Sequence, residues 1–383
     1  MGIEALETEI AFCLGNKKYR CLMNLVQTGK IEIATIHQID SPGLEDQVVQ
    51  DLDVVNLFTH NTIFPLTFLL RCGLLLQRLF YFEIDRRLGD LDYSLMLQSV
   101  INGILLGSIY GLIAMGLAII FGVVRIINLA HGDFLMVSMY IAYYLFTLFH
   151  IDPYISLVVS IPFLFVMGMI IQKVFIGPVQ KKKGPPENLL LITYGVGLII
   201  VNTAMLAFSP TYRSVLTAYA TKTIGIAGFS ASIISIFAFV MTSVAVALLF
   251  LFLKRTDTGK QIRATSENPE AALLLGINVD RISCLVFGIG AACVGLAGGL
   301  FVPMFYVYPT IGMHFTIKSF IVVVLGGLGS VIGAILGGII LGVVESLGAL
   351  YVSTAYKDVL GFILFLLILL FRPSGLFGEK TRL

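Results

Sequence analysis

The sequence predicts an all-α polytopic membrane protein with about eight transmembrane helices, and three observations support this class. Of the 383 residues, 57% are hydrophobic and only 13% are charged, whereas soluble domains have about 25% charged residues. The chain contains a series of nearly uncharged segments of about 20 residues, the length that crosses a bilayer. Glycine recurs at every fourth position in two of these segments. A net charge of only +2 gives no sign of nucleic-acid binding.

Charge density divides the chain near Leu95. Residues 1–94 contain 8 Lys/Arg and 13 Asp/Glu, and residues 95–383 contain 17 and 10. The number of glycines also differs between the two parts, with 6 in the first and 32 in the second. We therefore expect an acidic N-terminal extension of uncertain role (1–94) and a transmembrane domain (95–383). A misassigned start, with the native chain beginning near Asp92–Met96, explains the boundary equally well.

The extension contains one long apolar segment, Ile63–Phe82. Each of its Leu, Ile and Phe residues favours insertion by about 0.3–0.6 kcal/mol, whereas a central arginine such as Arg71 costs about 2.5–3.5 kcal/mol. Arg78 adds a smaller cost towards the end of the segment. These contributions nearly cancel, and we interpret the segment as interfacial or dispensable rather than as a true span.

The transmembrane domain contains a series of apolar segments of spanning length. They are Leu95–Val124, Ile127–Phe149, Pro153–Gln172, Leu189–Phe208, Ile233–Leu253, Cys284–Tyr306, Ile317–Val352 and Val359–Phe371. The segment Ile317–Val352 is long enough to cross twice, with a tight turn near Gly329 and Ser330.

The orientation follows from the basic loops, because Lys and Arg accumulate on the cytoplasmic side of a membrane. Basic residues cluster within 173–183, 254–281 and 372–382. Two predicted spans separate the first cluster from the second, and four separate the second from the third. Both numbers are even, so all three clusters are expected on the cytoplasmic side. The loop 209–232, which has few basic residues, is then external.

Two ladders of small residues predict close helix packing, since small side chains let helix backbones approach within a membrane. The first ladder consists of glycines followed mainly by alanines, and the second consists of two series of small residues, each with a spacing of four. The ladders are Gly103, Gly107, Gly111, Ala114, Ala118 and Gly122, and then Gly329, Gly333 and Gly337 beside Ala334, Gly338 and Gly342.

Polar residues within the spans are few, and each is a functional candidate because its burial is costly. Asn128, His131 and Asp133 open the second span, and Glu345 lies in the last long segment. His131 and Asp133 are two residues apart and would point to different faces of a helix, which favours an unwound or capping conformation. The pattern leaves two roles open for these residues: lining a substrate pathway, or interfacial capping and hydrogen bonding.

The basic loop 254–282 carries the sharpest local signal. Asn268 followed by Pro269 and Glu270 is a helix-start pattern, and Gly276 fits a helix end. The pattern predicts a two-turn apolar helix, Pro269–Leu275, outside the membrane. Either a groove of a partner protein or the membrane surface would cover it.

The same residues resemble a known family. Glu270-Ala271-Ala272, with Gly276 four residues later, is similar to the EAA-type coupling motif of bacterial ABC importer permeases. More specifically, the chain resembles LivH-type permeases of high-affinity branched-chain amino acid transporters. The resemblance covers about Tyr93 to Gly378, and its stretches are Ile101–Phe134 with INLAHGD, Ala264–Ile282 with LLGIN, Val323–Leu347, Tyr351–Phe362 and Arg372–Gly378.

The resemblance implies an ABC importer permease fold and a subunit that moves leucine, isoleucine or valine across the bacterial inner membrane. It implies a second homologous permease, two cytoplasmic ATPase subunits and an external substrate-binding protein as partners. It implies no catalytic residue, metal site or cofactor in this chain. ATP would bind to the partner subunit, in agreement with the absence of a Walker A motif from this sequence. The residues implied for ATPase coupling are Asn268, Glu270, Ala271, Ala272, Leu275, Gly276 and Asn278.

Other functions remain open at this stage. Related permeases of the resembling superfamily serve urea and short amides. A membrane-embedded enzyme would require clustered Asp, His and Glu at one membrane face, and only His131 and Asp133 approach this. A self-sufficient secondary carrier would require more intramembrane charge than Asp133 and Glu345 provide.

Overall fold

The structure, a computed structural model, describes residues 7–14, 17–26, 30–38, 93–182, 185–217, 219–226, 229–372 and 374–377. The chain divides into two compact units, Met1–Leu79 and Phe80–Leu383. The division predicted at residues 94 and 95 stays a prediction, and the apolar segment at residues 63–82 lies outside the described residues.

The first unit contains an antiparallel three-stranded sheet in the order β1 (Glu7–Leu14), β2 (Lys17–Val26) and β3 (Lys30–Gln38). In this meander, Leu14 pairs with Lys17 and Val26 pairs with Lys30. The sequence analysis did not predict these strands. The alternation of apolar residues in KIEIATIHQ is the signal that could have indicated the third of them.

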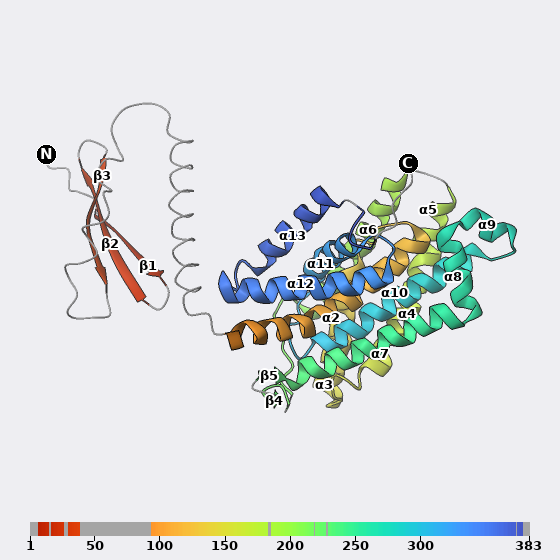
Figure 1. Cartoon of the computed structure of the whole chain (residues 1–383), viewed down its shortest axis with the longest axis horizontal. Coiled ribbons are helices and arrows are strands. Elements are labelled where there is room, and N and C mark those ends of the chain that lie inside the picture. The colour runs from red at the N-terminus through yellow and green to blue at the C-terminus, as the bar shows by residue number, and fades with distance from the viewer. Residues whose placement is uncertain are drawn as a thin grey trace. The chain divides into compact units, whose positions relative to one another are not determined.

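In the described residues of the second unit, the regular structure is helical apart from one short hairpin (Figure 1). Its first half consists of α2 (Tyr93–Val124), α3 (His131–Phe149), α4 (Leu157–Ile171), the π-helical segment η1 (Gln172–Ile176), α5 (Gly177–Lys181), α6 (Pro186–Phe208), β4 (Thr223–Ile226) and β5 (Phe229–Ser232). Its second half consists of α7 (Ile233–Arg255), α8 (Asp257–Glu267), α9 (Pro269–Leu274), α10 (Val279–Phe301), α11 (Ile311–Gly326), α12 (Val331–Tyr351) and α13 (Lys357–Phe371).

Within the described part of the chain, seven helices are long and apolar enough to cross a membrane. This finding confirms the predicted all-α membrane class. The predicted number of about eight transmembrane helices was approximate. The apolar α11 is shorter, at 16 residues, and α13 has 15. The long segment Ile317–Val352 does divide near Gly329 and Ser330, because α11 ends at Gly326 and α12 begins at Val331.

Several boundaries differ from the prediction. Helix α10 ends at Phe301 rather than Tyr306, because residues 302–310 form turns in which Val307 pairs with Arg213 of the loop before α7. Helix α3 begins at His131, so the expected unwound segment is limited to the residues before it. Hydropathy alone could not locate these ends, since the turn residues are as apolar as the helices.

Helix α2 runs along the second unit and contacts elements at both of its ends. Near its start, Gln98 bonds to Ser230 of β5, and near its end, Gly122 accepts a hydrogen bond from Ser266 of α8. Figure 1 accordingly shows the hairpin β4–β5 at one end of the unit and α5, α8 and α9 at the other. Two of the predicted basic loops therefore lie at the same end.

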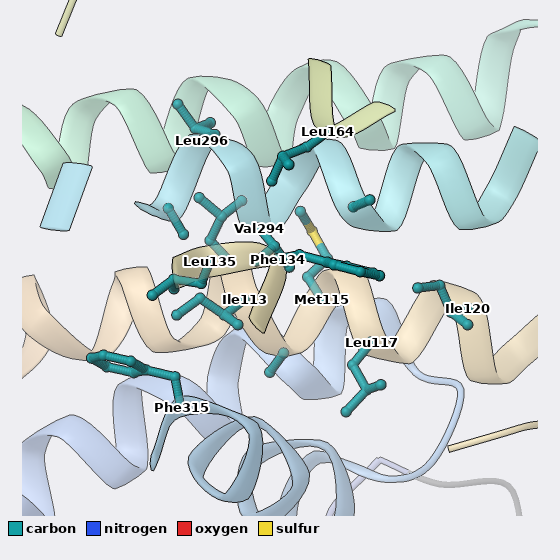
Figure 2. Packing of buried hydrophobic residues seen from close by; sticks show 14 of the residues in the cluster. Ile113, Met115, Leu117, Ile120, Phe134, Leu135, Leu164, Val294, Leu296 and Phe315 are labelled. Atoms are coloured by element: carbon teal, nitrogen blue, oxygen red, sulfur yellow. The ribbon is translucent and has the colours of Figure 1, made fainter. Parts of the chain in front are cut away.

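The core of the second unit lies where α2, α3 and α10 meet. Figure 2 shows Ile113 and Met115 of α2, Phe134 of α3 and Val294 of α10 packed together, and all four are fully or almost fully buried. By contrast, α7 has few buried residues, which are Ile234, Ala238, Thr242 and Leu249. Because lipid solvates such apolar faces, this pattern is typical of a helix at the periphery of a membrane domain.

Candidate functional site

Helix α9 begins and ends where its capping residues require. The side-chain oxygen of Asn268 accepts hydrogen bonds of 3.0 Å from the backbone N–H groups of both Glu270 and Ala271. Pro269 occupies the first helical position, where its missing N–H costs nothing. Gly276 adopts a φ of +82°, the left-handed conformation that ends helices and favours glycine. The structure therefore places a helix where the sequence predicts one, ending at Leu274 rather than Leu275.

The apolar side chains of α9 are largely uncovered. Ala272 is buried against the rest of the chain, whereas the exposed fractions are 64% for Leu273, 90% for Leu274 and 78% for Leu275. Glu270 and Ala271 are exposed as well. Three consecutive exposed leucines on a short helix at a basic end of the molecule make an apolar surface suited to a partner.

The two ends of the α9 region are anchored to the helical bundle. Asn278 caps α10, because its side-chain oxygen accepts a 3.0 Å hydrogen bond from the Arg281 N–H. At the other end, the Ser266 hydroxyl of α8 donates a 2.9 Å hydrogen bond to the Gly122 carbonyl of α2. The guanidinium of Arg125 lies 3.4 Å from the carbonyl oxygen of Ser266. Movement of α9 would therefore be transmitted to α2 and α10.

Asn128 and His131 precede and begin α3, and both are buried. The Asn128 side-chain oxygen accepts a 3.1 Å hydrogen bond from the Ala130 N–H, and the His131 Nε2 lies 2.9 Å from the Ile113 carbonyl oxygen of α2. The remaining side-chain nitrogens, Asn128 Nδ2 and His131 Nδ1, have no hydrogen-bond partner among the described residues. Each of these residues has thus one structural contact and one unused polar atom.

Asp133 lies in the first turn of α3 with an exposed fraction of only 6%. Its carboxylate fits between two glycines: a Cβ added to Gly312 of α11 would be 2.3 Å from Oδ1, and one added to Gly197 of α6 would be 2.6 Å from Oδ2. Among the described residues it has no hydrogen-bond or ionic partner. Because burial of an unpaired carboxylate is costly, Asp133 is the strongest candidate for contact with a ligand in this segment.

Glu345 belongs to a different group of polar side chains. Its two carboxylate oxygens lie 2.7 and 2.8 Å from the Lys318 ammonium of α11, and the Tyr110 hydroxyl of α2 donates a 3.1 Å hydrogen bond to Oε2. Lys318 is also 2.9 Å from the Asp358 carboxylate of α13. Glu345 and Lys318 are almost completely buried. We call Tyr110, Lys318, Glu345 and Asp358 the ionic cluster.

Sequence analysis missed three members of the ionic cluster. Lys318 is a single cation inside a long apolar segment, which by itself marks a residue that needs a buried partner. Tyr110 carries no such signal, because tyrosine is common in transmembrane helices. The cluster joins four helices, α2, α11, α12 and α13, and both it and Asp133 contact α11. Lys318, Glu345 and Asp358 form ion pairs, whereas Asp133 has no ionic partner in the part of the chain that the structure describes.

The glycine ladders let the backbones of α2 and α12 approach closely, and we call this contact the seam. A Cβ on Gly107 would be 2.5 Å from the Gly338 carbonyl oxygen, and one on Gly342 would be 2.3 Å from the Gly103 carbonyl oxygen. Gly111 lies against Ile335 in the same way. Backbones at such distances exclude any side chain larger than hydrogen.

The second row of glycines has other contacts. A Cβ on Gly333 would be 2.2 Å from the Gly326 carbonyl oxygen, and one on Gly337 would be 2.8 Å from that of Val322, so this row faces α11. Gly329 lies outside α12, in the turn, with a φ of +83°. This position agrees with the turn predicted near Gly329 and Ser330. A Cβ on Gly329 would be 3.5 Å from the Gly122 Cα of α2, and its helix-packing role stays a prediction.

At the opposite end from α9, aromatic side chains hold the long loop that follows α6. The Tyr219 hydroxyl donates to the Asp152 carboxylate, at 2.9 and 3.0 Å, and burial followed by this hydrogen bond raises the pKa of the tyrosine. The Arg213 guanidinium lies 5.5 Å from the Tyr144 ring centroid, and its backbone pairs with Val307. This loop is consequently fixed against α3 and the turn after α10.

Comparison with known proteins places the chain in a family. The model of the family described as the branched-chain amino acid transport system permease component matches residues 99–369. The high-affinity branched-chain amino acid transport system permease protein LivH of Salmonella typhimurium is 36% identical over 304 residues, covering 75% of this chain and 97% of that protein. No solved structure matches.

Two further relatives show similar coverage. The corresponding Pseudomonas aeruginosa permease, BraD, is 34% identical over 74% of this chain and 96% of its own length. A probable branched-chain amino acid transport permease of Methanocaldococcus jannaschii is 31% identical over 76% of this chain and 94% of its own length. Since the family model matches well over half of the chain, this multi-pass membrane protein belongs to the permease component family of branched-chain amino acid transport systems.

Proposed function

We propose that this chain is the permease subunit of an ATP-driven importer that carries branched-chain amino acids across the bacterial inner membrane. It works with a second homologous permease, two cytoplasmic ATPase subunits and an external substrate-binding protein. The chain binds no ATP of its own. The observation that carries the proposal is the exposed apolar surface of α9, supported by the family match and by the names of the relatives.

In this proposal α9 inserts into a groove of the ATPase. Leu273, Leu274 and Leu275 supply the apolar contact, and Ala272 fixes the helix to the permease. The anchors at Ser266 and Asn278 connect α9 to α2 and α10, and through them to the core. A change in the ATPase would thus reach the transmembrane helices through a short and well-capped segment.

We expect Leu274→Asp to abolish most ATP-driven leucine uptake by proteoliposomes that contain the complete transporter. Loss of one central apolar anchor from an interface costs about 2 kcal/mol or more, equivalent to an affinity about 30-fold lower. The measurement is the initial rate of radiolabelled leucine uptake with ATP on the ATPase side, together with co-purification of the ATPase. Leu216→Asp is the matched control, because Leu216 is 82% exposed but belongs to the loop at the other end.

The results separate the parts of the proposal. Wild-type uptake and ATPase binding by Leu274→Asp would overturn the docking role of α9. ATP-driven uptake of urea without any uptake of leucine, isoleucine or valine would contradict the substrate class. Failure of the permease to purify with any ATPase would contradict the importer assignment itself.

A substrate pathway beside the start of α3 forms the second part of the proposal. Asn128, His131 and Asp133 have unused polar atoms there, and the Asp133 carboxylate matches the ammonium group of an amino acid in charge. The glycines on either side of Asp133 place backbone rather than side chains of their own against the carboxylate. Glu345, whose partners already satisfy it, is assigned to helix packing in this proposal rather than to the pathway.

We expect Asp133→Asn to lower leucine uptake by about tenfold or more while the complex still assembles. A hydrogen bond to a charged group contributes about 1.5–3 kcal/mol, and asparagine keeps the size of aspartate but loses its charge. The rate of uptake and the ATPase activity stimulated by loaded binding protein are measured together. Normal uptake by Asp133→Asn would remove Asp133 from the pathway.

A further inference from the structure

A cavity of about 370 Å³ opens at the end of the second unit that holds α8 and α9. Its walls come from α2, α7, α8 and the start of α12, and they are mostly apolar. Ile119, Val123, Phe250 and Ile332 are among the residues that line it. Ser266 and Gly122, whose hydrogen bond joins α8 to α2, also line it, but the proposed transport mechanism assigns no occupant to the cavity.

Two cations lie at the cavity, Lys254 at the end of α7 and Arg263 in α8. Neither forms an ion pair with any described residue. Their neighbour Lys260, which does not line the cavity, is by contrast 2.9 Å from Asp257. The cavity therefore combines an apolar interior with two cations whose charge the described residues do not neutralise.

The start of α12 adds a third feature that favours an anion. Ser330 caps this 21-residue helix by accepting a 3.1 Å hydrogen bond from the Gly333 N–H. The N–H groups of Val331 and Ile332, two residues that line the cavity, donate to no described residue. Unpaired N–H groups at a helix start carry partial positive charge and bind phosphate and carboxylate groups.

We propose that this cavity binds an anionic phospholipid of the cytoplasmic leaflet. The phosphate group contacts Lys254, Arg263 and the start of α12, and an acyl chain lies along the apolar wall. This assignment rests on the proposed orientation, in which α8 and α9 face the cytoplasm. Basic pockets between transmembrane helices on that side bind acidic headgroups, because the leaflet itself is anionic.

Such a lipid would act on the segment that carries α9. It would bridge α7, α8 and α12, while α8 is otherwise joined to α2 by the Ser266–Gly122 hydrogen bond. An occupied cavity holds α8 in place, and α9 follows α8 after a single residue. The bound lipid would therefore strengthen the connection between the ATPase and the transmembrane helices.

The test measures lipid retained by the complete transporter. The complex is purified with its partners from membranes containing phosphatidylglycerol and phosphatidylcholine, and bound lipid is identified by native mass spectrometry. We expect phosphatidylglycerol to remain bound to the wild type, and Lys254→Gln/Arg263→Gln to lower its affinity about 30-fold, or about 2 kcal/mol. Arg255→Gln/Lys260→Gln is the matched control, because it removes two charges from the same region outside the cavity.

Three outcomes would overturn the lipid proposal. Equal loss of lipid in the two double variants would show a general effect of surface charge. Equal retention of phosphatidylcholine would remove the requirement for an acidic headgroup, and full displacement of the lipid by inorganic phosphate would assign the site to a free anion. Because lipid retention is measured without transport, a complex that binds phosphatidylglycerol but fails to import leucine would contradict only the proposed function.

Discussion

Lys318→Met is expected to destabilise the transporter by about 3–5 kcal/mol, because it removes the cation between two carboxylates. Glu345 is buried and would be left with only the Tyr110 hydroxyl as a partner. Methionine has nearly the volume of the lysine stem, so the effect reports the charge rather than a cavity. The measurement is the temperature at which the purified complex loses its assembled peak in size-exclusion chromatography.

Two further variants make this prediction specific. Lys318→Met/Glu345→Leu is expected to recover most of the lost stability, because both buried charges are then absent and Asp358, whose side chain is 39% exposed, can be solvated. Lys357→Met removes a neighbouring cation that forms no ion pair with a described residue, and should have little effect. A single variant Lys318→Met as stable as the wild type would show that the cluster does not hold these helices together.

Gly338→Leu is expected to disrupt the seam between α2 and α12, at a cost of about 3 kcal/mol or more. A Cβ at this position would be 2.2 Å from the backbone nitrogen of Gly111 and 2.4 Å from its Cα. Backbone atoms cannot move aside as the end of a flexible side chain can, so the two helices must separate. We expect the assembled complex to be lost even without heating. The measurement is the assembled peak in size-exclusion chromatography.

Gly195→Leu is the matched control for this prediction, because a Cβ at Gly195 of α6 meets no atom within 4 Å. It changes glycine to leucine in an equally helical position but without a neighbouring backbone. We expect normal assembly of this variant. Equal loss of assembly in both variants would mean that leucine in a helix, rather than the close approach of α2 and α12, causes the defect.

Local sequence patterns predicted most of the elements correctly. The order Asn268, Pro269, Glu270 and Gly276 predicted a capped helix, and α9 is present with the expected N-cap. Capping depends on residues a few positions apart, so it is readable from the chain alone. The turn between α11 and α12 also depends on neighbouring residues, so it was predictable from the sequence. Gly327 and Gly329 in this turn both adopt positive φ angles, which favour glycine.

Other features depend on contacts between distant segments. Tyr110 and Glu345 are 235 residues apart, and no local pattern indicates that α2 and α12 bring them together. Likewise, His131 and Asp133 were expected in an unwound or capping conformation, and both lie in the first turn of α3. Only the tertiary structure shows their neighbours, which are α2 for His131 and α6 with α11 for Asp133. Thr316 of α11 accepts the Gly132 N–H at 2.9 Å, so a distant segment satisfies one of the first-turn N–H groups of α3.

The sequence by itself determined that this chain is a multi-pass membrane protein with a capped apolar helix on a basic loop. Hydropathy over about 20 residues and capping over about four are local quantities, and they do not depend on how the helices pack. Only the tertiary structure decided which polar residues are satisfied and which are not. It paired Lys318 with Glu345 and Asp358, and it left Asp133 without a polar partner and the cations Lys254 and Arg263 without an anion among the described residues. In a membrane such differences identify function, because an unpaired charge persists there only when something outside the chain compensates for it.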